Sequence, residues 1–163
     1  MSPILVAGIG NVFKGDDGFG VAVAQHLAGR ALPPGVRVVD FGIRGLDLVY
    51  ALLDGYAAAI LVDTVRRGEP PGTVYVIEPE PASDEAENLL VSPHAMEPAK
   101  VLRLAAALGG RCGRVVLVGC EPASFGDEEF GAMELSPAVA AAVARAAITV
   151  ETLACQLIDE EER

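Results

Sequence analysis

The sequence is poor in cysteine, and its few cysteines are not arranged in pairs. They are Cys112, Cys120 and Cys155, an odd number with no Cys-x-x-Cys spacing. We therefore expect neither a disulfide framework nor a structural zinc knuckle. Because disulfides are rare in the cytosol, this cysteine usage favours a cytoplasmic protein.

Basic residues and long apolar runs are also scarce. The net charge is −11, since 23 acidic residues outnumber 12 lysines and arginines. Nucleic-acid binding depends on clustered cations that neutralise phosphates, so nucleic acid is not an expected partner. No stretch of about 18 apolar residues is free of charge, so we do not expect a membrane span.

Apolar runs alternate with helical patterns along the chain. This order predicts a single α/β domain over residues 1–163, with a mostly parallel five-stranded sheet between two layers of helices. The mixed pattern of 73–77 is typical of a strand near the sheet edge. The expected strands are 4–7, 36–39, 58–62, 73–77 and 115–118; the expected helices are 18–30, 46–53, 98–108 and 137–158; the expected surface loops are 78–93 and 120–134.

A Gly-x-Gly sequence, Gly8-Ile9-Gly10, follows the first expected strand. It could indicate dinucleotide binding, but the third glycine of that fingerprint would fall at Phe13. The neighbouring acids would also repel a pyrophosphate, and no phosphate-binding GxxxxGK[ST] sequence is present. We therefore favour a tight turn that needs a positive φ.

Several acidic residues follow the expected strands. In parallel sheets, ligands bind beyond the carboxyl ends of the strands. Carboxylates gathered at that edge repel one another, so a cation is their natural partner. Plainer roles stay open, because an acid of the Asp16-Asp17 pair could cap the next helix and Asp63 could pair with Arg66 or Arg67. Asp40 carries the same ambiguity.

His94 is one of only two histidines and lies in a loop, Ser92-Pro93-His94. Loops on a rigid scaffold often carry functional residues. The other histidine, His26, falls on the polar side of a helix and is expected at the surface. Two carboxylates and one imidazole would suit Zn, Ni, Mn or Fe, with coordination positions left open for chemistry.

Five segments, in order, resemble motifs of the [NiFe]-hydrogenase maturation endopeptidases. They span nearly the whole chain with similar spacing. They are GIGNVFKGDDGFGV at 8–21, DFGIRG at 40–45, LVDT at 61–64, SPH at 92–94 and GCEP at 119–122. One departure is Ile43, where the family often has a small hydroxyl residue, so the chain could recognise a somewhat different precursor.

The resemblance implies a function and a site. Family members trim a C-terminal extension from the hydrogenase large-subunit precursor after nickel insertion. They bind a metal through two acids and one histidine, which fall on Asp17, Asp63 and His94, and Asp16 is left as the helix cap. The expected protein is thus a metal-dependent, aspartic-type endopeptidase that recognises nickel. The precursor would supply the nickel, although zinc or another divalent ion is possible.

The same residues are compatible with two other functions. The same ligands could serve a nickel-responsive binding module or chaperone for the large subunit that does not cleave. A cysteine hydrolase using Cys120 and His94 is a second alternative, since Cys120 follows an expected strand at the same edge. Within the leading hypothesis, Asp16 or Asp40 could help to move protons.

Overall fold

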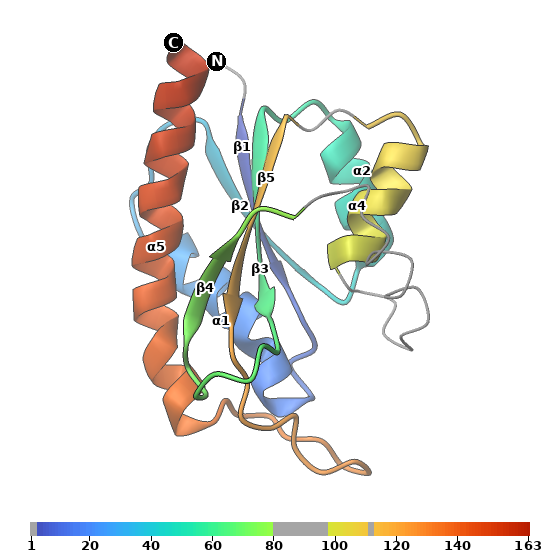
Figure 1. The fold of residues 1–163 in the computed structure, drawn as a ribbon, viewed down its shortest axis with the longest axis vertical. Coiled ribbons are helices and arrows are strands. Elements are labelled where there is room, and N and C mark those ends of the chain that lie inside the picture. The colour runs from blue at the N-terminus through green and yellow to red at the C-terminus, as the bar shows by residue number, and fades with distance from the viewer. Residues whose placement is uncertain (1–2, 80–97, 111–112) are drawn as a thin grey trace.

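The computed structural model describes residues 3–79, 98–110 and 113–163. Their five strands form one sheet in the order β2-β1-β3-β5-β4 (Figure 1). Four strands are parallel, and β4 pairs antiparallel with β5 at the edge, which confirms the predicted α/β class and the edge position of β4. The strands are β1 (Ile4–Ile9), β2 (Val36–Gly42), β3 (Ala58–Thr64), β4 (Val74–Ile77) and β5 (Arg114–Cys120).

Four strands run further than the sequence predicts, and the first of them, β1, continues to Ile9. β2 continues to Gly42, β3 to Thr64 and β5 to Cys120. The polar ends stay in the sheet because Asp63 is paired with Gly119 and Thr64 with Cys120. Asp40 and Asp63 are therefore strand residues, not the first residues of the loops that follow.

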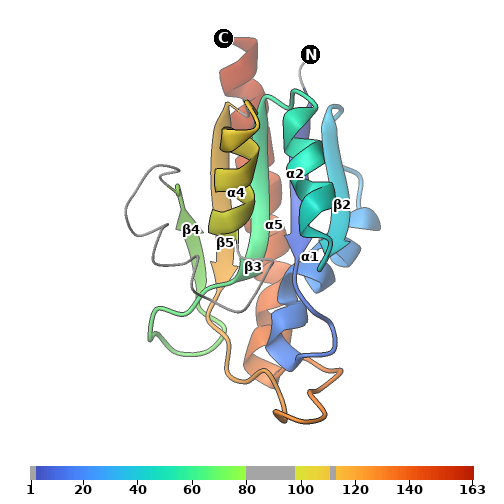
Figure 2. The same cartoon turned by 90° about the vertical axis from the view of Figure 1, so that its right-hand side faces the viewer.

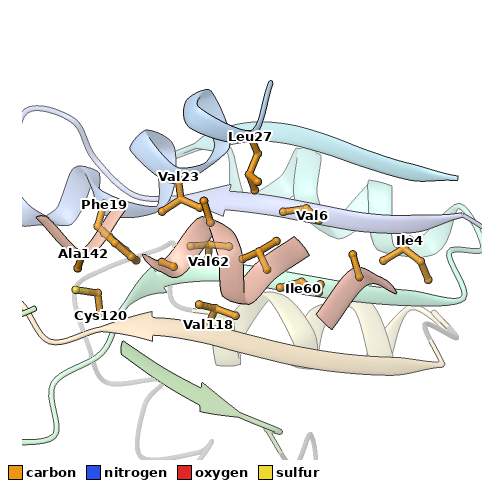
Figure 3. Close-up of a cluster of buried hydrophobic side chains, with 14 of the residues drawn as sticks. Ile4, Val6, Phe19, Val23, Leu27, Ile60, Val62, Val118, Cys120 and Ala142 are labelled. Carbon is orange, nitrogen blue, oxygen red and sulfur yellow. The ribbon is translucent and has the colours of Figure 1, made fainter. Parts of the chain in front are cut away.

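Helices cover both faces of the sheet. On one face lie α1 (Phe19–Ala28) and α5 (Pro137–Glu162), and on the other α2 (Gly45–Leu53) and α4 (Pro98–Ala107) (Figure 2). Successive strand residues point to opposite faces. Ile4 and Val6 pack under α1 and α5 (Figure 3). Leu5 and Ala7 pack on the other face, under α2.

Helix α5 begins as predicted, with Ser136 at the N-cap and a proline at the first position, and it ends four residues later than expected, at Glu162. Among the described residues it is the one helix long and apolar enough to cross a membrane. Its buried face, which includes Ala142, Ala146 and Val150, packs in the core beneath the sheet. One third (33%) of its most apolar stretch is buried within the domain.

Glycines bring the first helix unusually close to the sheet. A Cβ added at Gly20 would lie 2.2 Å from the Val62 carbonyl oxygen and 2.3 Å from that of Ile9. Gly10 has the positive φ that the sequence predicts, and a Cβ there would lie 1.8 Å from the Asp17 carbonyl oxygen. The Gly-x-Gly turn therefore packs the short 3₁₀ helix η1 (Gly15–Gly18) against the end of β1.

Candidate functional site

Asp17 and Asp63 both lie at the carboxyl edge of the sheet, and each is hydrogen-bonded to Thr64. The Thr64 N–H donates a 2.8 Å hydrogen bond to Asp63 Oδ1, and its hydroxyl donates a long bond of 3.5 Å to Asp17 Oδ1. Asp63 is only 8% exposed. The fold therefore brings two carboxylates that are distant in the sequence to one residue, in a region where water is largely excluded from Asp63.

A second hydrogen bond, from the glycine-rich turn, also fixes the orientation of the Asp17 carboxylate. Its Oδ2 accepts a 3.1 Å hydrogen bond from the Asn11 N–H, within the glycine-rich turn. A carboxylate offers about four acceptor sites, so these two bonds leave Asp17 able to bind a cation. Carboxylate oxygens are suitable ligands for a divalent metal ion.

His94, the third predicted ligand, lies outside the described residues, as does most of the 78–93 loop. Within 3–79, 98–110 and 113–163, no group of three or more His, Cys, Asp or Glu side chains is placed to hold a metal ion. The complete set of Asp17, Asp63 and His94 therefore stays a prediction. His26, in contrast, is exposed on α1, as predicted.

Asp16 has a different role from the one predicted. It does not cap α1, whose N-cap is Gly18 and receives no side-chain hydrogen bond. The Asp16 carboxylate is fully buried and accepts hydrogen bonds from the N–H groups of Ala123 (2.8 Å), Ser124 (3.0 Å) and Ser136 (2.7 Å) and from the Ser136 hydroxyl (2.9 Å). Asp16 thus fastens the 121–136 loop to η1.

These donors also determine the ionisation of Asp16. Burial by itself raises the pKa of the carboxyl, but the hydrogen bonds from Ser124, Ser136 and Ala123 outweigh it, and the pKa is lowered. Asp16 is therefore a stable anion whose acceptor sites are occupied by the protein. That makes it a poor candidate for moving protons.

Glu121 is a second buried anchor, which the sequence reasoning missed. It is 5% exposed, and its Oε1 accepts hydrogen bonds from the N–H groups of Arg67 (2.7 Å) and Glu69 (3.1 Å) and from the Tyr75 hydroxyl (2.8 Å). The Arg67 bond lowers the pKa of Glu121 most. Burial, together with the bond to Glu121, raises the pKa of Tyr75 to about 12. Glu121 holds the loop between β3 and β4 in place.

The remaining charged residues near this edge have distinct surroundings. Asp40 is exposed, and its backbone carbonyl accepts a hydrogen bond from the Arg44 guanidinium. Arg66 and Arg67, which the sequence suggested as ion-pair partners of Asp63, lie over the rings of Phe125 (4.5 Å) and Tyr75 (5.7 Å).

The position of Cys120 argues against the cysteine-hydrolase alternative. Its side chain is fully buried in the core cluster under α1 and α5 (Figure 3). Asp63 is paired with the preceding residue, Gly119, so Cys120 points to the opposite face of the sheet. Burial, followed by the charge of Asp16, raises the pKa of the thiol to about 11. A thiol that is buried and protonated is not a nucleophile.

Comparison with known proteins identifies similar sequences. The hydrogenase maturation protease family matches residues 21–153. The hydrogenase expression/formation protein HupD of Rhodobacter capsulatus is 37% identical over 140 residues, which cover 84% of this chain and 64% of HupD. HoxM of Cupriavidus necator is 34% identical over 76% of this chain and 61% of HoxM. The chain thus spans somewhat less than two thirds of these two relatives.

Solved structures resemble the chain over more of their length. The hydrogenase maturating endopeptidase HybD from Escherichia coli superposes with a TM-score of 0.74 at 28% identity, covering 91% of this chain and 89% of HybD. A hydrogenase 2 maturation peptidase from a Thaumarchaeota archaeon gives 0.68 at 33% identity, covering 91% of this chain and 96% of that one.

Proposed function

Because the chain belongs to the hydrogenase maturation protease family, we propose that it removes the C-terminal extension of a [NiFe]-hydrogenase large-subunit precursor. The observation that carries the proposal is the pair of carboxylates, Asp17 and Asp63, that are both hydrogen-bonded to Thr64. The motif resemblance adds His94 as the third ligand.

In this proposal, Asp17, Asp63 and His94 receive the nickel that the precursor carries. The bound ion would polarise the scissile carbonyl for attack by water. Thr64 and Asn11 hold Asp17 in orientation, while Asp16 keeps η1 fastened to the neighbouring loop. Water would add to the carbonyl carbon and lose a proton; the C–N bond would then break, and that proton would pass to the leaving amine. The exposed carboxylate of Asp40 is the candidate acceptor for the proton that the water loses.

If the precursor supplies the nickel ion, only a precursor that contains nickel should be cleaved. Purified precursor, with and without nickel, is incubated with the purified chain, and the products are read by intact mass. We expect loss of the C-terminal peptide only from the nickel-loaded precursor. Equal cleavage without any metal would contradict the nickel proposal, and a stable complex without mass loss would favour the chaperone alternative.

A further inference from the structure

The 121–136 loop, between β5 and α5, carries exposed apolar side chains at the carboxyl end of the sheet (Figure 1). Phe130 and Met133 in this loop are 82% and 71% exposed, and Phe13, in the turn after β1, is 62% exposed. We call these three side chains the apolar tip. Apolar side chains that gather on the surface of a folded protein mark a site for a partner.

Backbone hydrogen bonds bring the two segments of the apolar tip together. The Ala132 N–H donates to the Phe13 carbonyl (3.0 Å), and the Gly15 N–H donates to the Ala132 carbonyl (2.7 Å). Lys14 and Ala132 form the resulting β-bridge, so Phe13 adjoins the bridge on one segment and Met133 adjoins it on the other. The apolar tip is therefore one surface, although its residues are far apart in the sequence.

The turn that carries Phe130 is closed by its own hydrogen bonds. Asp127 and Gly131 exchange two backbone bonds, of 3.1 and 2.6 Å. The Asp127 carboxylate also accepts bonds from the N–H groups of Glu129 (2.8 Å) and Phe130 (3.2 Å). The Phe130 side chain thus faces solvent from an ordered backbone. An aromatic side chain held in this way loses little conformational entropy when a partner covers it.

Three exposed carboxylates, Glu128, Glu129 and Glu134, lie next to Phe130 and Met133 in the sequence. We call them the tip carboxylates. Among the described residues, none of the three makes a hydrogen bond or an ion pair through its side chain. Negative charge that is not paired within the chain complements a partner segment that carries lysines or arginines.

The charge also discriminates between possible occupants of this surface. A second copy of the chain would bring the same carboxylates, and a net charge of −11, against the first. A membrane of anionic lipids would bring phosphates. Both would place like charges opposite one another, which is unfavourable. A basic protein segment with apolar side chains would instead bury the apolar tip and neutralise the tip carboxylates.

The apolar tip is joined to the residues that orient Asp17. The Asn11 N–H donates to the Asp17 carboxylate (3.1 Å), and the Asn11 side chain accepts a bond from the Phe13 N–H (2.9 Å). Asp16, next to Asp17, holds the start of the same loop through the Ser124 N–H (3.0 Å). A partner bound to the apolar tip would therefore lie beside the candidate site.

We infer that the apolar tip and the tip carboxylates dock a basic, apolar segment of the large-subunit precursor beside Asp17. The identity of the partner rests on the proposed function, whereas the chemistry of the docked segment rests on this surface.

Binding of purified nickel-loaded precursor to the immobilised chain tests the apolar contact. Phe130→Ala should weaken binding about tenfold or more, because exposed aromatic anchors carry much of the binding energy of an interface. Since Phe130 does not touch the reacting atoms, kcat at saturating precursor should be unchanged. Ile148→Ala is the matched control, because Ile148 is 57% exposed and lies about three turns along α5 from the loop. It should leave binding unchanged, and circular dichroism checks that both variants fold.

The double variant Glu128→Gln/Glu129→Gln tests the charge. It should weaken binding at low salt and reduce the loss of binding that added salt causes in the wild type. Glu161→Gln/Glu162→Gln changes the same charge at the far end of α5, a helix of 26 residues and therefore about 39 Å long (Figure 1). This control should keep the salt dependence of the wild type.

A photo-crosslinking phenylalanine analogue at position 130 then identifies the docked segment by mass spectrometry. We expect apolar residues flanked by Lys or Arg. Unchanged binding by folded Phe130→Ala, tighter binding by Glu128→Gln/Glu129→Gln, a crosslink to an acidic segment or a dimer that Phe130→Ala dissociates would each overturn the inference. Phe130-dependent binding without cleavage by the wild-type chain would sink the protease function and leave the docking surface standing. Cleavage with a KM that Phe130→Ala does not change would do the reverse.

Discussion

The carboxylates of Asp16, Glu121 and Asp17 lie at the same end of the sheet, and they differ in what surrounds them. The anchoring carboxylates, Asp16 and Glu121, are buried and receive several hydrogen bonds from backbone N–H groups of distant loops. The open carboxylate, Asp17, is only partly buried and accepts a hydrogen bond from the Asn11 N–H and a long one from the Thr64 hydroxyl. Asp16 and Asp17 are adjacent in the sequence, so the difference arises from the donors that the fold supplies.

This comparison predicts that an open carboxylate is needed for activity and not for folding. Asp17→Asn should reduce cleavage of the precursor by about 100-fold or more, since even the loss of a supporting partner costs a metal site 10–100-fold. Its unfolding midpoint should stay close to that of the wild type. Asp159→Asn, at an exposed position on α5, is the control and should keep full activity. Normal processing by Asp17→Asn would contradict the proposed site.

An anchoring carboxylate should show the opposite behaviour. Asp16→Asn keeps the shape of the side chain but directs an NH₂ group toward donors that need an acceptor. We expect a loss of about 2–4 kcal/mol in the free energy of unfolding, because hydrogen bonds to charged groups contribute about 1.5–3 kcal/mol each. Urea denaturation measures this loss. A stability equal to that of the wild type would show that the 121–136 loop is held by other contacts.

The anchoring carboxylates also predict how stability depends on pH. The pKa values of Asp16 and Glu121 are lowered in the folded chain, so the unfolded chain binds more protons as the pH falls below their ordinary values of 3.8 and 4.5. Their contribution is fully present above about pH 4.5 and is lost as the pH falls through the lower, folded values. Urea midpoints between pH 3 and 6 should therefore decline on acidification, and less steeply in Asp16→Asn.

The smallest effect is expected at Cys120, which lies on the other face of the sheet from Asp63. Cys120→Ala should retain cleavage and lose about 1 kcal/mol of stability, as a modest core truncation does. Iodoacetamide should modify the exposed Cys155 of the folded chain and spare Cys120. Loss of cleavage in a folded Cys120→Ala variant would revive the cysteine hydrolase.

The placement of the predicted elements follows from local patterns. Apolar strands that alternate with helical patterns predict the α/β order, and the mixed pattern of 73–77 predicts the edge strand. Both predictions work because the spacing of apolar residues reflects whether one face or both faces of an element are buried. The acids that follow these strands could be assigned to one edge for the same reason, since parallel strands end together. Strand ends were less predictable, because Asp63 and Thr64 stay in the sheet through pairing with β5.

The sequence by itself thus determined the order of the elements and the sheet edge at which Asp17 and Asp63 lie. Only the tertiary structure decided that Asp16 is an anchor, that Cys120 faces the core and that Phe130 is left exposed. The donors to Asp16 come from positions 107 to 120 residues away, so no local pattern could reveal them. Hydrogen-bond partners and the exposure of loop side chains depend on how separate elements pack, whereas periodicity reports only which side of each element is buried.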